Sequence, residues 1–541
     1  MRKLRQVCFL TLLISLAAVA ASAQSFRVQC PTSTVTHPNA ANNNSEPAYL
    51  GPTYTGTNGF PTAPAHVNGA IKCQQISGGD GYATMADGTQ TFMFSFGPLS
   101  GLADIANGLP GTEFPAVFNS IYQGTFRAGD PDTTGLATFT YNGAVGLATD
   151  YYAGLNGALM TAADGHVDPR QILDVGVMNG NIPAPLMAFD EDDEFFLTLS
   201  NVGMIMRPDL FEQHTVHFHG YPNASSVYDG VPDASVAINI GGSFTYYYLA
   251  PDAGTYFWHC HITPPEHLQM GMVGQLYVRP RQDRVAAGSS LYASLQAQQA
   301  DLRTACRRFN DGATPAVTTV NPDILCSNPL PANGGILPGN TAATTAAAGV
   351  LYAYNDGDGL TAYDVEYPLQ IHGFDPNFHF VGMTFNPENF ATMKDKYFLL
   401  NGRSYPDTVT PGPLEAESAD GNKHFSQPLP SIINIPAGKK ALLRISDLDV
   451  TEFQTLASLG IPMHVVGYNA KLLRDQAGNN LDYYTNSITL GGGESLDVIL
   501  DASNTTLYPS GSVFYLYTPN LDHLSNDAEN FGGLMTEVHI N

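Results

Sequence analysis

Positive charge is scarce in this sequence. Of its 541 residues, 23 are Lys or Arg and 49 are Asp or Glu, which gives a formal net charge of -26. A surface of this sign repels the phosphates of nucleic acids and anionic lipids. We therefore expect no nucleic-acid partner. Solubility explains the acidic balance more simply than an attraction for metal cations or cationic partners does.

Long apolar runs are almost absent too. The one exception is N-terminal, where Arg2, Lys3 and Arg5 precede an apolar run over 7–20 and the small residues "ASA" end at Ala23. This order predicts a secretory signal peptide cleaved after Ala23, and the run is short for a membrane anchor. No other stretch approaches the ~20 apolar residues that span a bilayer. We expect a periplasmic or extracellular protein without a membrane span.

Cysteine is rare, with six residues in the chain. Cys8 would leave with the signal peptide, and Cys260 lies in a histidine-rich motif discussed below. The other four could form disulfides in an oxidising compartment. The simplest pairs are Cys30–Cys73 and Cys306–Cys326, although sequence alone does not fix the connectivity.

Short β-type runs are plentiful between turn residues. The chain has 53 Gly and 37 Pro, and they separate runs such as "TFMFSF", "EFFLTLS", "SFTYYYLA" and "SLDVILD". This pattern is typical of a β-sandwich or barrel. One helix is predicted over 288–309, at the start of a Pro/Gly/Ala-rich stretch that ends near 349. The acidic "DEDDE" at 190–194 is expected to be a solvated strand entrance rather than a cation-collecting site.

An internal repeat sets the predicted domain organisation. "HTVHFHGY" (214–221) aligns with "IPMHVVGY" (461–468), and "GTYFWHCH" (254–261) aligns with "GSVFYLYT" (511–518). Landmarks that recur in one order at an offset of about 250 residues predict two copies of one β-domain. The predicted parts are listed in chain order: signal peptide 1–23, N-terminal extension 24–80, first domain 81–285 with an insertion at about 100–170, linker with helix 286–350, and second domain 351–541.

Two short segments of the first copy concentrate metal-binding side chains. They are "HTVHFHG" and "WHCHITPPEHLQMGM". Because alternate side chains of a strand point to opposite faces, His214 is predicted to share a face with Cys260. The same alternation places four histidines on the other face: His217, His219, His259 and His261. The two segments therefore predict two sites on opposite sides of neighbouring strands.

The first predicted site is completed by His267 and Met272, which follow Cys260 after a turn. Two imidazoles, a thiolate and a weak axial thioether match a blue-copper site that transfers single electrons. Zinc is the competing metal, but methionine is a poor zinc ligand and structural zinc sites usually take more cysteines. The second set, four imidazoles, suits a copper cluster at a domain boundary. The alternative to a metal site is that the first set consists of core histidines with satisfied hydrogen bonds, and that some histidines of the second set face solvent or are hydrogen-bonded.

These segments resemble the multicopper oxidase family, whose copper-rich domain has an H-x-x-H-x-H-G strand and an H-C-H-x(3)-H-x(4)-M/L segment. The resemblance is strong over about 180–280 and weaker over 365–541. It implies an all-β fold of two cupredoxin-like Greek-key β-sandwich domains. It makes His214, Cys260, His267 and Met272 the type 1 copper ligands. It makes His217 a type 2 ligand, and His219, His259 and His261 type 3 ligands.

The function that the resemblance implies is a secreted copper-dependent oxidoreductase. Electrons would pass from a small reductant, phenolic or a metal ion, at type 1 copper to dioxygen at a type 2/type 3 cluster. Glu266, next to His267, is the candidate for contact with the reductant. The sequence does not identify that reductant.

The sequence departs from the family in its second copy. The family's trinuclear cluster uses four H-x-H pairs, and this chain has two. Val466, Leu516 and Thr518 stand at matching positions of the repeat, and Tyr517 stands in place of the cysteine. Four of the six histidines of the second half are predicted to be structural: His372, His379, His464 and His523.

Three alternatives follow from this departure. A homotrimer or a partner chain could complete the cluster. The chain could instead resemble copper nitrite reductase, with mononuclear type 2 copper, because His219 and His259 occupy the matching positions, although His217 stands where that enzyme keeps an Asp. It could also be a non-catalytic electron-transfer cupredoxin, since the second copy is degenerate. The segment between Cys260 and His267 is also two residues longer than the usual spacing.

Overall fold

The computed structural model describes residues 28–34, 37, 69–119, 165–167, 169, 178–220, 225–250, 252–299, 344–384, 386, 389–417, 423–475 and 479–541. The predicted signal peptide, most of the predicted extension and insertion, and the predicted Cys306–Cys326 pair lie outside these residues. Within the described part, no helix is both long and apolar enough to cross a membrane.

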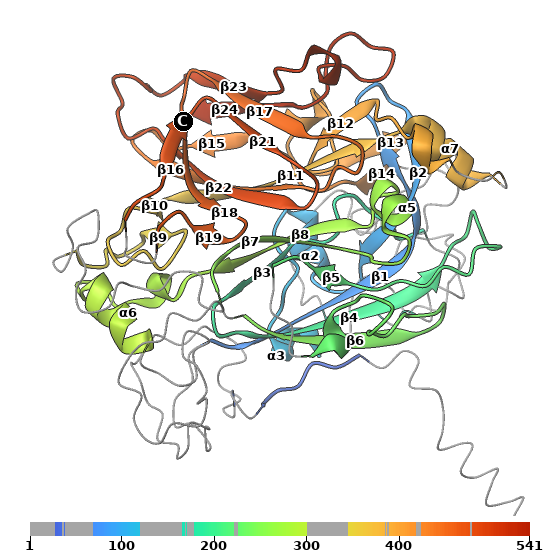
Figure 1. Cartoon of the computed structure of the whole chain (residues 1–541), viewed down its shortest axis with the longest axis horizontal. Helices are drawn as coiled ribbons and strands as arrows, with labels where there is room; N and C mark the ends of the chain where they lie inside the picture. The colour runs from blue at the N-terminus through green and yellow to red at the C-terminus, as the bar shows by residue number, and fades with distance from the viewer. Residues whose placement is uncertain are drawn as a thin grey trace, which may run out of the picture.

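The chain forms two stacked β-sandwiches, which confirms the all-β prediction (Figure 1). The first sandwich consists of two four-stranded sheets. In sheet order, its strands are β2 (Gln90–Pro98), β1 (Ile71–Thr84), β4 (Glu194–Gly203) and β6 (Ser243–Leu249) in one sheet, and β3 (Met187–Asp190), β8 (Val273–Arg279), β7 (Gly254–His259) and β5 (His217–Phe218) in the other. β1 runs parallel to β4 and β3 runs parallel to β8, while the other neighbours are antiparallel.

The second sandwich consists of a seven-stranded and a five-stranded sheet. The larger sheet contains β12 (Tyr397–Leu400), β11 (Val365–Phe374), β16 (Lys440–Asp447), β22 (Glu494–Asp501), β18 (Met463–Tyr468), β19 (Lys471–Leu472) and β20 (Tyr483–Thr485). The smaller contains β15 (Ile433–Ile435), β24 (Met535–Ile540), β23 (Val513–Tyr517), β17 (Gln454–Leu459) and β21 (Ser487–Leu490). Two short ribbons are separate: β9 (Leu351–Tyr352) with β10 (Ala362–Tyr363), and β13 (Leu414–Glu417) with β14 (Lys423–Ser426).

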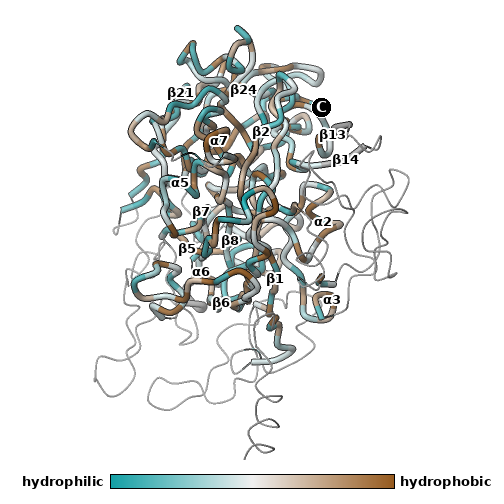
Figure 2. The backbone as a smooth tube through the Cα atoms, turned by 90° about the vertical axis from the view of Figure 1, so that its right-hand side faces the viewer, coloured by the Kyte–Doolittle hydropathy of each residue, from teal (hydrophilic) through white to brown (hydrophobic). Residues whose placement is uncertain are grey.

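Helices in the described part are short. The α-helices are α2 (Leu102–Ala106), α3 (Pro115–Phe118), α5 (Pro264–Gln269), α6 (Leu291–Gln299) and α7 (Pro376–Met383). The 3-10 helices are η5 (Ser226–Tyr228), η6 (Arg281–Arg284), η8 (Phe390–Thr392), η9 (Asp407–Val409) and η10 (Leu521–His523). α6 is the described part of the helix predicted over 288–309. α2 and α7 are coloured as hydrophobic in Figure 2, in keeping with the buried residues on each.

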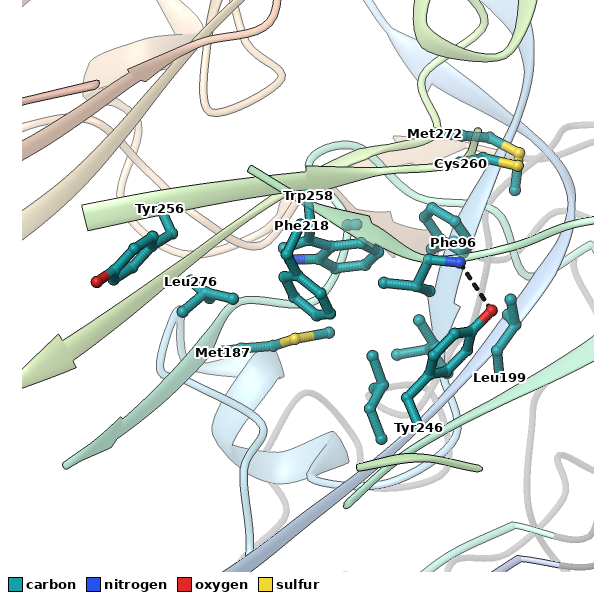
Figure 3. Packing of buried hydrophobic residues seen from close by; sticks show 14 of the residues in the cluster. Phe96, Met187, Leu199, Phe218, Tyr246, Tyr256, Trp258, Cys260, Met272 and Leu276 are labelled. Carbon is teal, nitrogen blue, oxygen red and sulfur yellow. Dashed lines mark hydrogen bonds between the residues drawn. The ribbon is translucent and has the colours of Figure 1, made fainter. Parts of the chain in front are cut away.

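β7 is buried on both faces, and this positions the metal-binding motif. Tyr256 and Trp258 point into the first core, where the Trp258 ring lies 4.9 Å from that of Phe96 (Figure 3). Phe257 points the other way, into a cluster that includes Phe374 and Leu448 of the second sandwich. The alternation predicted from the sequence therefore divides the side chains of β7 between a core and an interface.

Hydrogen bonds join β7 and β8 to the large sheet of the second sandwich. Thr255 Oγ1 donates to Asp497 Oδ1 at 2.6 Å, and Ser495 Oγ donates to the Thr255 carbonyl at 2.7 Å. Gln275 Nε2 donates to Ser446 Oγ at 2.8 Å. Buried polar groups paired in this way hold the two sheets in one register.

The acidic segment at 190–194 is not solvated, so that expectation was wrong. Asp193 and Glu194 are almost fully buried. Asp192 pairs with Arg281 at 2.8 Å and with Arg284 at 3.0 Å. Arginines that lie far away in the sequence thus compensate Asp192 and, through Arg281 at 3.5 Å, Glu191. Asp193 and Glu194 instead accept hydrogen bonds, from the Ala70 N–H at 2.6 Å and from the Tyr247 hydroxyl at 2.7 Å.

The first sandwich begins earlier in the chain than residue 81. β1 starts at Ile71, and the disulfide Cys30–Cys73 ties it to the N-terminal segment, which confirms that predicted pair. The strand was missed because "IKCQQISGGDGYAT" shows no alternation, since nearly all of its residues are buried, polar ones included.

Candidate metal centres

The first cluster lies on the core side of β7. His214 precedes β5 and forms a bridge with Ile238, Cys260 follows β7, and His267 lies in α5. Cys260 Sγ is 3.2 Å from His267 Nδ1 and 4.0 Å from His214 Nδ1. The three side chains are all 0% exposed, and their donor atoms lie within 4.8 Å of one another.

Met272 completes this cluster from the end of the same segment. The Cys260 N–H donates to the Met272 carbonyl at 3.2 Å, and the Met272 N–H donates to the His267 carbonyl at 2.8 Å. Both sulfur-bearing side chains belong to the same buried cluster, at the edge of the core drawn in Figure 3. Helix α5, which starts with two prolines, connects Cys260 to Met272, so the longer spacing is accommodated by a helical turn.

The electrostatics of the first cluster favour a thiolate. Burial acts to raise the pKa of Cys260, but His267 and His214 outweigh it and hold that pKa well below its usual value. Burial acts to lower the pKa of His267, but the facing Cys260 raises it to about 10. The Thr215 N–H also donates to Cys260 Sγ at 3.4 Å. The thiolate is the form of cysteine that binds a metal.

Neighbouring residues fix the two imidazoles of this cluster. A Cβ on Gly78 would lie 2.5 Å from His214 Cδ2, so this position has room only for glycine. The Phe94 ring lies 5.1 Å from that of His267. His267 Nε2 is 3.5 Å from Glu212 Oε2. With both Nδ1 atoms turned toward Cys260, the set of two imidazoles, a thiolate and a thioether fits a type 1 copper.

The second cluster lies on the opposite side of the same strands. His217 and His259 are cross-strand partners on β5 and β7, and the His219 N–H donates to the Phe257 carbonyl at 3.1 Å. The donor atoms of His217, His219 and His259 lie within 4.8 Å of one another. His219 Nε2 and His259 Nε2 are 2.9 Å apart, close to the ~3 Å between neighbouring ligands that a metal–imidazole bond of about 2 Å produces.

Backbone carbonyls orient two of these rings. His217 Nδ1–H donates to the Asp229 carbonyl at 2.6 Å, and His259 Nδ1–H donates to the Cys260 carbonyl at 2.7 Å. Their Nε2 atoms are therefore left to face the cluster, an arrangement typical of metal-bound histidine. Burial and neighbouring imidazoles lower the pKa of His219 to about 4 and that of His259 to about 3. Both rings are neutral at pH 7, as metal binding requires.

The ring of His261 packs against this group about as closely as the three rings pack against one another, which are 5.0–5.4 Å apart, so only the position of its donor atom sets it apart. Its ring centroid is 5.0 Å from that of His217 and 5.6 Å from that of His259. Its backbone N–H donates to Thr215 Oγ1 at 3.0 Å, which fixes the chain next to the first cluster. Its donor atom does not belong to the set that lies within 4.8 Å.

The four histidines of the second half that were predicted to be structural lie elsewhere, in hydrogen bonds of their own. His372 bonds the Leu448 carbonyl at 3.0 Å, and His379 bonds the Gln269 carbonyl at 2.9 Å. His464 pairs with Asp482 at 2.8 Å, and His523 bonds Gln454 Oε1 at 3.0 Å. None of the four joins a metal-binding group in the described part of the chain.

Two residues near the clusters were not found from the sequence. Glu212 lies against the Nε2 edge of His267, with Oε2 at 3.5 Å. Gly493 of the second sandwich lies next to His219, since a Cβ on it would be 3.6 Å from His219 Nδ1. Glu212 is only two positions from His214, so its closeness to a ligand was a usable signal. Nothing in the sequence connects Gly493 with His219.

Comparisons with known proteins match the part of the chain that carries both clusters. The profile of the family described as multicopper oxidase matches residues 161–283. Laccase-1 of Emericella nidulans is 36% identical over 117 residues, which cover 21% of this chain and 17% of that protein. Laccase 1 of Metarhizium guizhouense is 30% identical over 115 residues, with the same two coverages. The matched segment thus spans less than a fifth of the length of these curated relatives.

Solved structures of similar fold include the multicopper oxidase mgLAC. It is 15% identical, has a TM-score of 0.45, and the match covers 87% of this chain and 86% of that one. The blue copper oxidase from Nitrosomonas europaea is 19% identical, with a TM-score of 0.41 over 67% of this chain and 78% of that one. On the family profile and the sequence relatives, the part of the chain that carries both histidine clusters is a domain of the multicopper oxidase family.

Proposed function

We propose that the protein is an exported copper-dependent oxidase that takes electrons from a small reductant, phenolic or a metal ion, and passes them to dioxygen. The observation that carries the proposal is the direct connection between the two clusters. Cys260 belongs to the first, its neighbour His259 belongs to the second, and His259 Nδ1 donates to the Cys260 carbonyl at 2.7 Å. An electron accepted at the first cluster has a short covalent route to the second.

The proposed copper ligands form two sites with different roles. His214, Cys260, His267 and Met272 would hold a type 1 copper, and the histidines around His217 would hold the copper that faces dioxygen. Bound copper would supply the one-electron redox chemistry and the affinity for dioxygen. Trp258 and Phe96 pack behind Cys260 and keep water from the thiolate. Asp229 and Cys260 supply the carbonyls that hold the second site's imidazoles.

The reductant is proposed to bind where His267 comes nearest the surface. His267 is itself 0% exposed, so a reductant does not touch it directly. Glu212, whose side chain is 25% exposed, lies 3.5 Å from its Nε2 atom, and the neighbouring Phe211 is 81% exposed. A carboxylate beside an exposed aromatic ring suits a metal ion or a phenol as the electron donor.

Glu212→Gln is expected to slow reduction of the first site. The substitution keeps the shape of the side chain but removes the negative charge next to His267, so we expect a rate about tenfold lower with Fe(II), equivalent to about 1.4 kcal/mol. Stopped-flow absorbance of the blue copper band measures this rate. Asp233→Asn, at an exposed acid in the loop between η5 and β6, is the matched control and should change the rate little. An unchanged rate in Glu212→Gln would place the reductant elsewhere.

Oxygen uptake tests the function as a whole. The copper-loaded protein is given a phenol, Mn(II), Fe(II) or Cu(I) in an oxygen electrode, and at least one should drive uptake. A parallel anaerobic assay with nitrite as acceptor tests the reductase alternative. Full copper loading without oxygen uptake from any of the four reductants would rule out the proposed oxidase. Export is checked separately, since the mature protein should begin after Ala23.

A further inference from the structure

The second cluster lacks the ligands of a trinuclear copper site. Such a site in this family takes four H-x-H pairs, and the whole sequence has two, His217/His219 and His259/His261. His372, His379, His464 and His523 of the second sandwich are hydrogen-bonded elsewhere, as described above, and His539 Nε2 bonds Glu537 Oε2 at 2.6 Å. His372, His379 and His523 are also at most 2% exposed, so they cannot reach a site on another subunit without unfolding their surroundings.

A glycine turn closes the side of the cluster that faces the second sandwich. The turn joins β21 to β22 as Gly491–Gly493, and the Gly493 N–H donates to the Asp447 carbonyl at 2.8 Å. A Cβ on Gly492 would lie 2.1 Å from the Asp449 carbonyl oxygen. Gly493 has φ +102°, a conformation that side-chain-bearing residues rarely adopt. A ligand-bearing residue therefore does not fit at this wall, and the second sandwich contributes packing rather than coordination.

His217, His219 and His259 of the first sandwich converge on one point without a ligand from the second sandwich. Two of them have Nδ1 hydrogen-bonded to backbone carbonyls, and the third, His219, turns Nδ1 toward Gly493. All three thus present Nε2 to a common point, and their donor atoms lie within 4.8 Å of one another. The side chain of His217 is 18% exposed, so this ligand lies on the solvent side of the site. Three imidazoles and one open position are a complete ligand set for one ion, as in three-histidine metal sites generally.

We infer that the second centre is a single-copper site formed within one chain by His217, His219 and His259, with His261 outside its ligand set. The chain then binds two copper ions, one at each cluster. The inference deepens the proposed function and rests on it, because it assigns the dioxygen-facing site of the same oxidase. It differs from a cluster completed by a partner subunit, since no donor from another chain is required.

Copper counting on the full-length protein tests the inference. The protein is loaded with excess Cu(II), desalted, and measured by plasma mass spectrometry together with EPR. We expect two copper ions per chain, one with a type 1 and one with a type 2 signal. His219→Ala and His217→Ala should each lower the count to one and keep the blue band. His261→Ala is the matched control, from the same pair of strands, and should keep two.

Any wild-type count other than two, or loss of copper from His261→Ala, overturns the inference. These two measurements decide the matter even if His219→Ala or His217→Ala does not fold. They are also independent of the oxidase proposal. A protein that binds two coppers but consumes no oxygen would refute the oxidase function and leave the single-copper site standing. A protein that binds four coppers and consumes oxygen would support the oxidase function and refute the single-copper site.

Discussion

Cys260→Ser is expected to abolish the blue absorption band and to lower the oxidase rate by a factor of about 10³ or more. The physical reason is the loss of the only thiolate in the first cluster. Cys260 Sγ lies 3.2 Å and 4.0 Å from the two imidazole nitrogens that share the site. A serine hydroxyl stays protonated at neutral pH and is a hard ligand, so it replaces neither the charge nor the softness of sulfur. The copper content should fall by one ion per chain.

Met272→Leu is the control for this prediction. It removes the other sulfur of the cluster from an equally buried position, but an axial thioether is a weak ligand. The variant should keep its copper and its blue colour, with a shifted reduction potential. Absorption spectra, copper analysis and oxygen uptake compare the two variants, and circular dichroism checks that both fold. A blue Cys260→Ser protein with normal turnover would remove Cys260 from the electron route.

The division of the motif into two sites could be predicted from the sequence because it depends on local geometry alone. In "WHCH" the alternation of an extended chain places Cys260 opposite His259, whatever the rest of the fold does. The structure keeps this arrangement although β5 is only the two residues His217–Phe218. His214 lies outside that strand, and its bridge with Ile238 holds it on the face of Cys260.

Features that depend on distant segments could not be predicted in this way. Asp192 in "DEDDE" depends on Arg281 and Arg284, and the wall beside His219 depends on Gly493. β1 was missed since a strand buried on both faces carries no alternating pattern. Each feature is fixed by a segment far along the chain: the arginines for Asp192, Gly493 for His219, and β4 for β1. Taken alone, the residues are equally compatible with an exposed surface or a loop.

The second sandwich, although it lacks most of the histidines of the first, holds the segment that carries part of the first cluster. The Asp375 N–H donates to Gln269 Oε1 at 2.8 Å, and His379 Nε2 bonds the Gln269 carbonyl at 2.9 Å. Gln269 is the last residue of α5, the helix that carries His267 and leads to Met272. His379 and the backbone of Asp375 in the second sandwich thus hold the segment that carries His267 and Met272 in the first. The second sandwich is a positioning element for the first cluster.

An ion pair across the interface between the sandwiches carries the largest expected effect on stability. Glu366 of β11 binds Arg279 of β8 at 2.5 Å and Arg444 of β16 at 2.9 Å. Arg444 is 0% exposed. Glu366→Gln would leave the fully buried guanidinium of Arg444 without this carboxylate and would weaken the pairing of Arg279, whose side chain is 34% exposed, which is expected to cost about 3 kcal/mol of unfolding free energy at pH 7. Asp501→Asn, which breaks the more exposed pair with Lys440, is the control and should cost at most about 1 kcal/mol.

The pH dependence of this difference identifies its electrostatic origin. Burial acts to raise the pKa of Glu366, but Arg444 and Arg279 outweigh it and lower that pKa to about 2, from an ordinary value of 4.5. The stabilisation is therefore fully present above pH 4.5 and is lost as the pH falls toward 2, by about 3 kcal/mol in total. Urea unfolding followed by the fluorescence of Trp258, the single tryptophan, should show wild type and Glu366→Gln converging over that range. A gap that stays constant down to pH 2 would assign the loss to packing instead of charge.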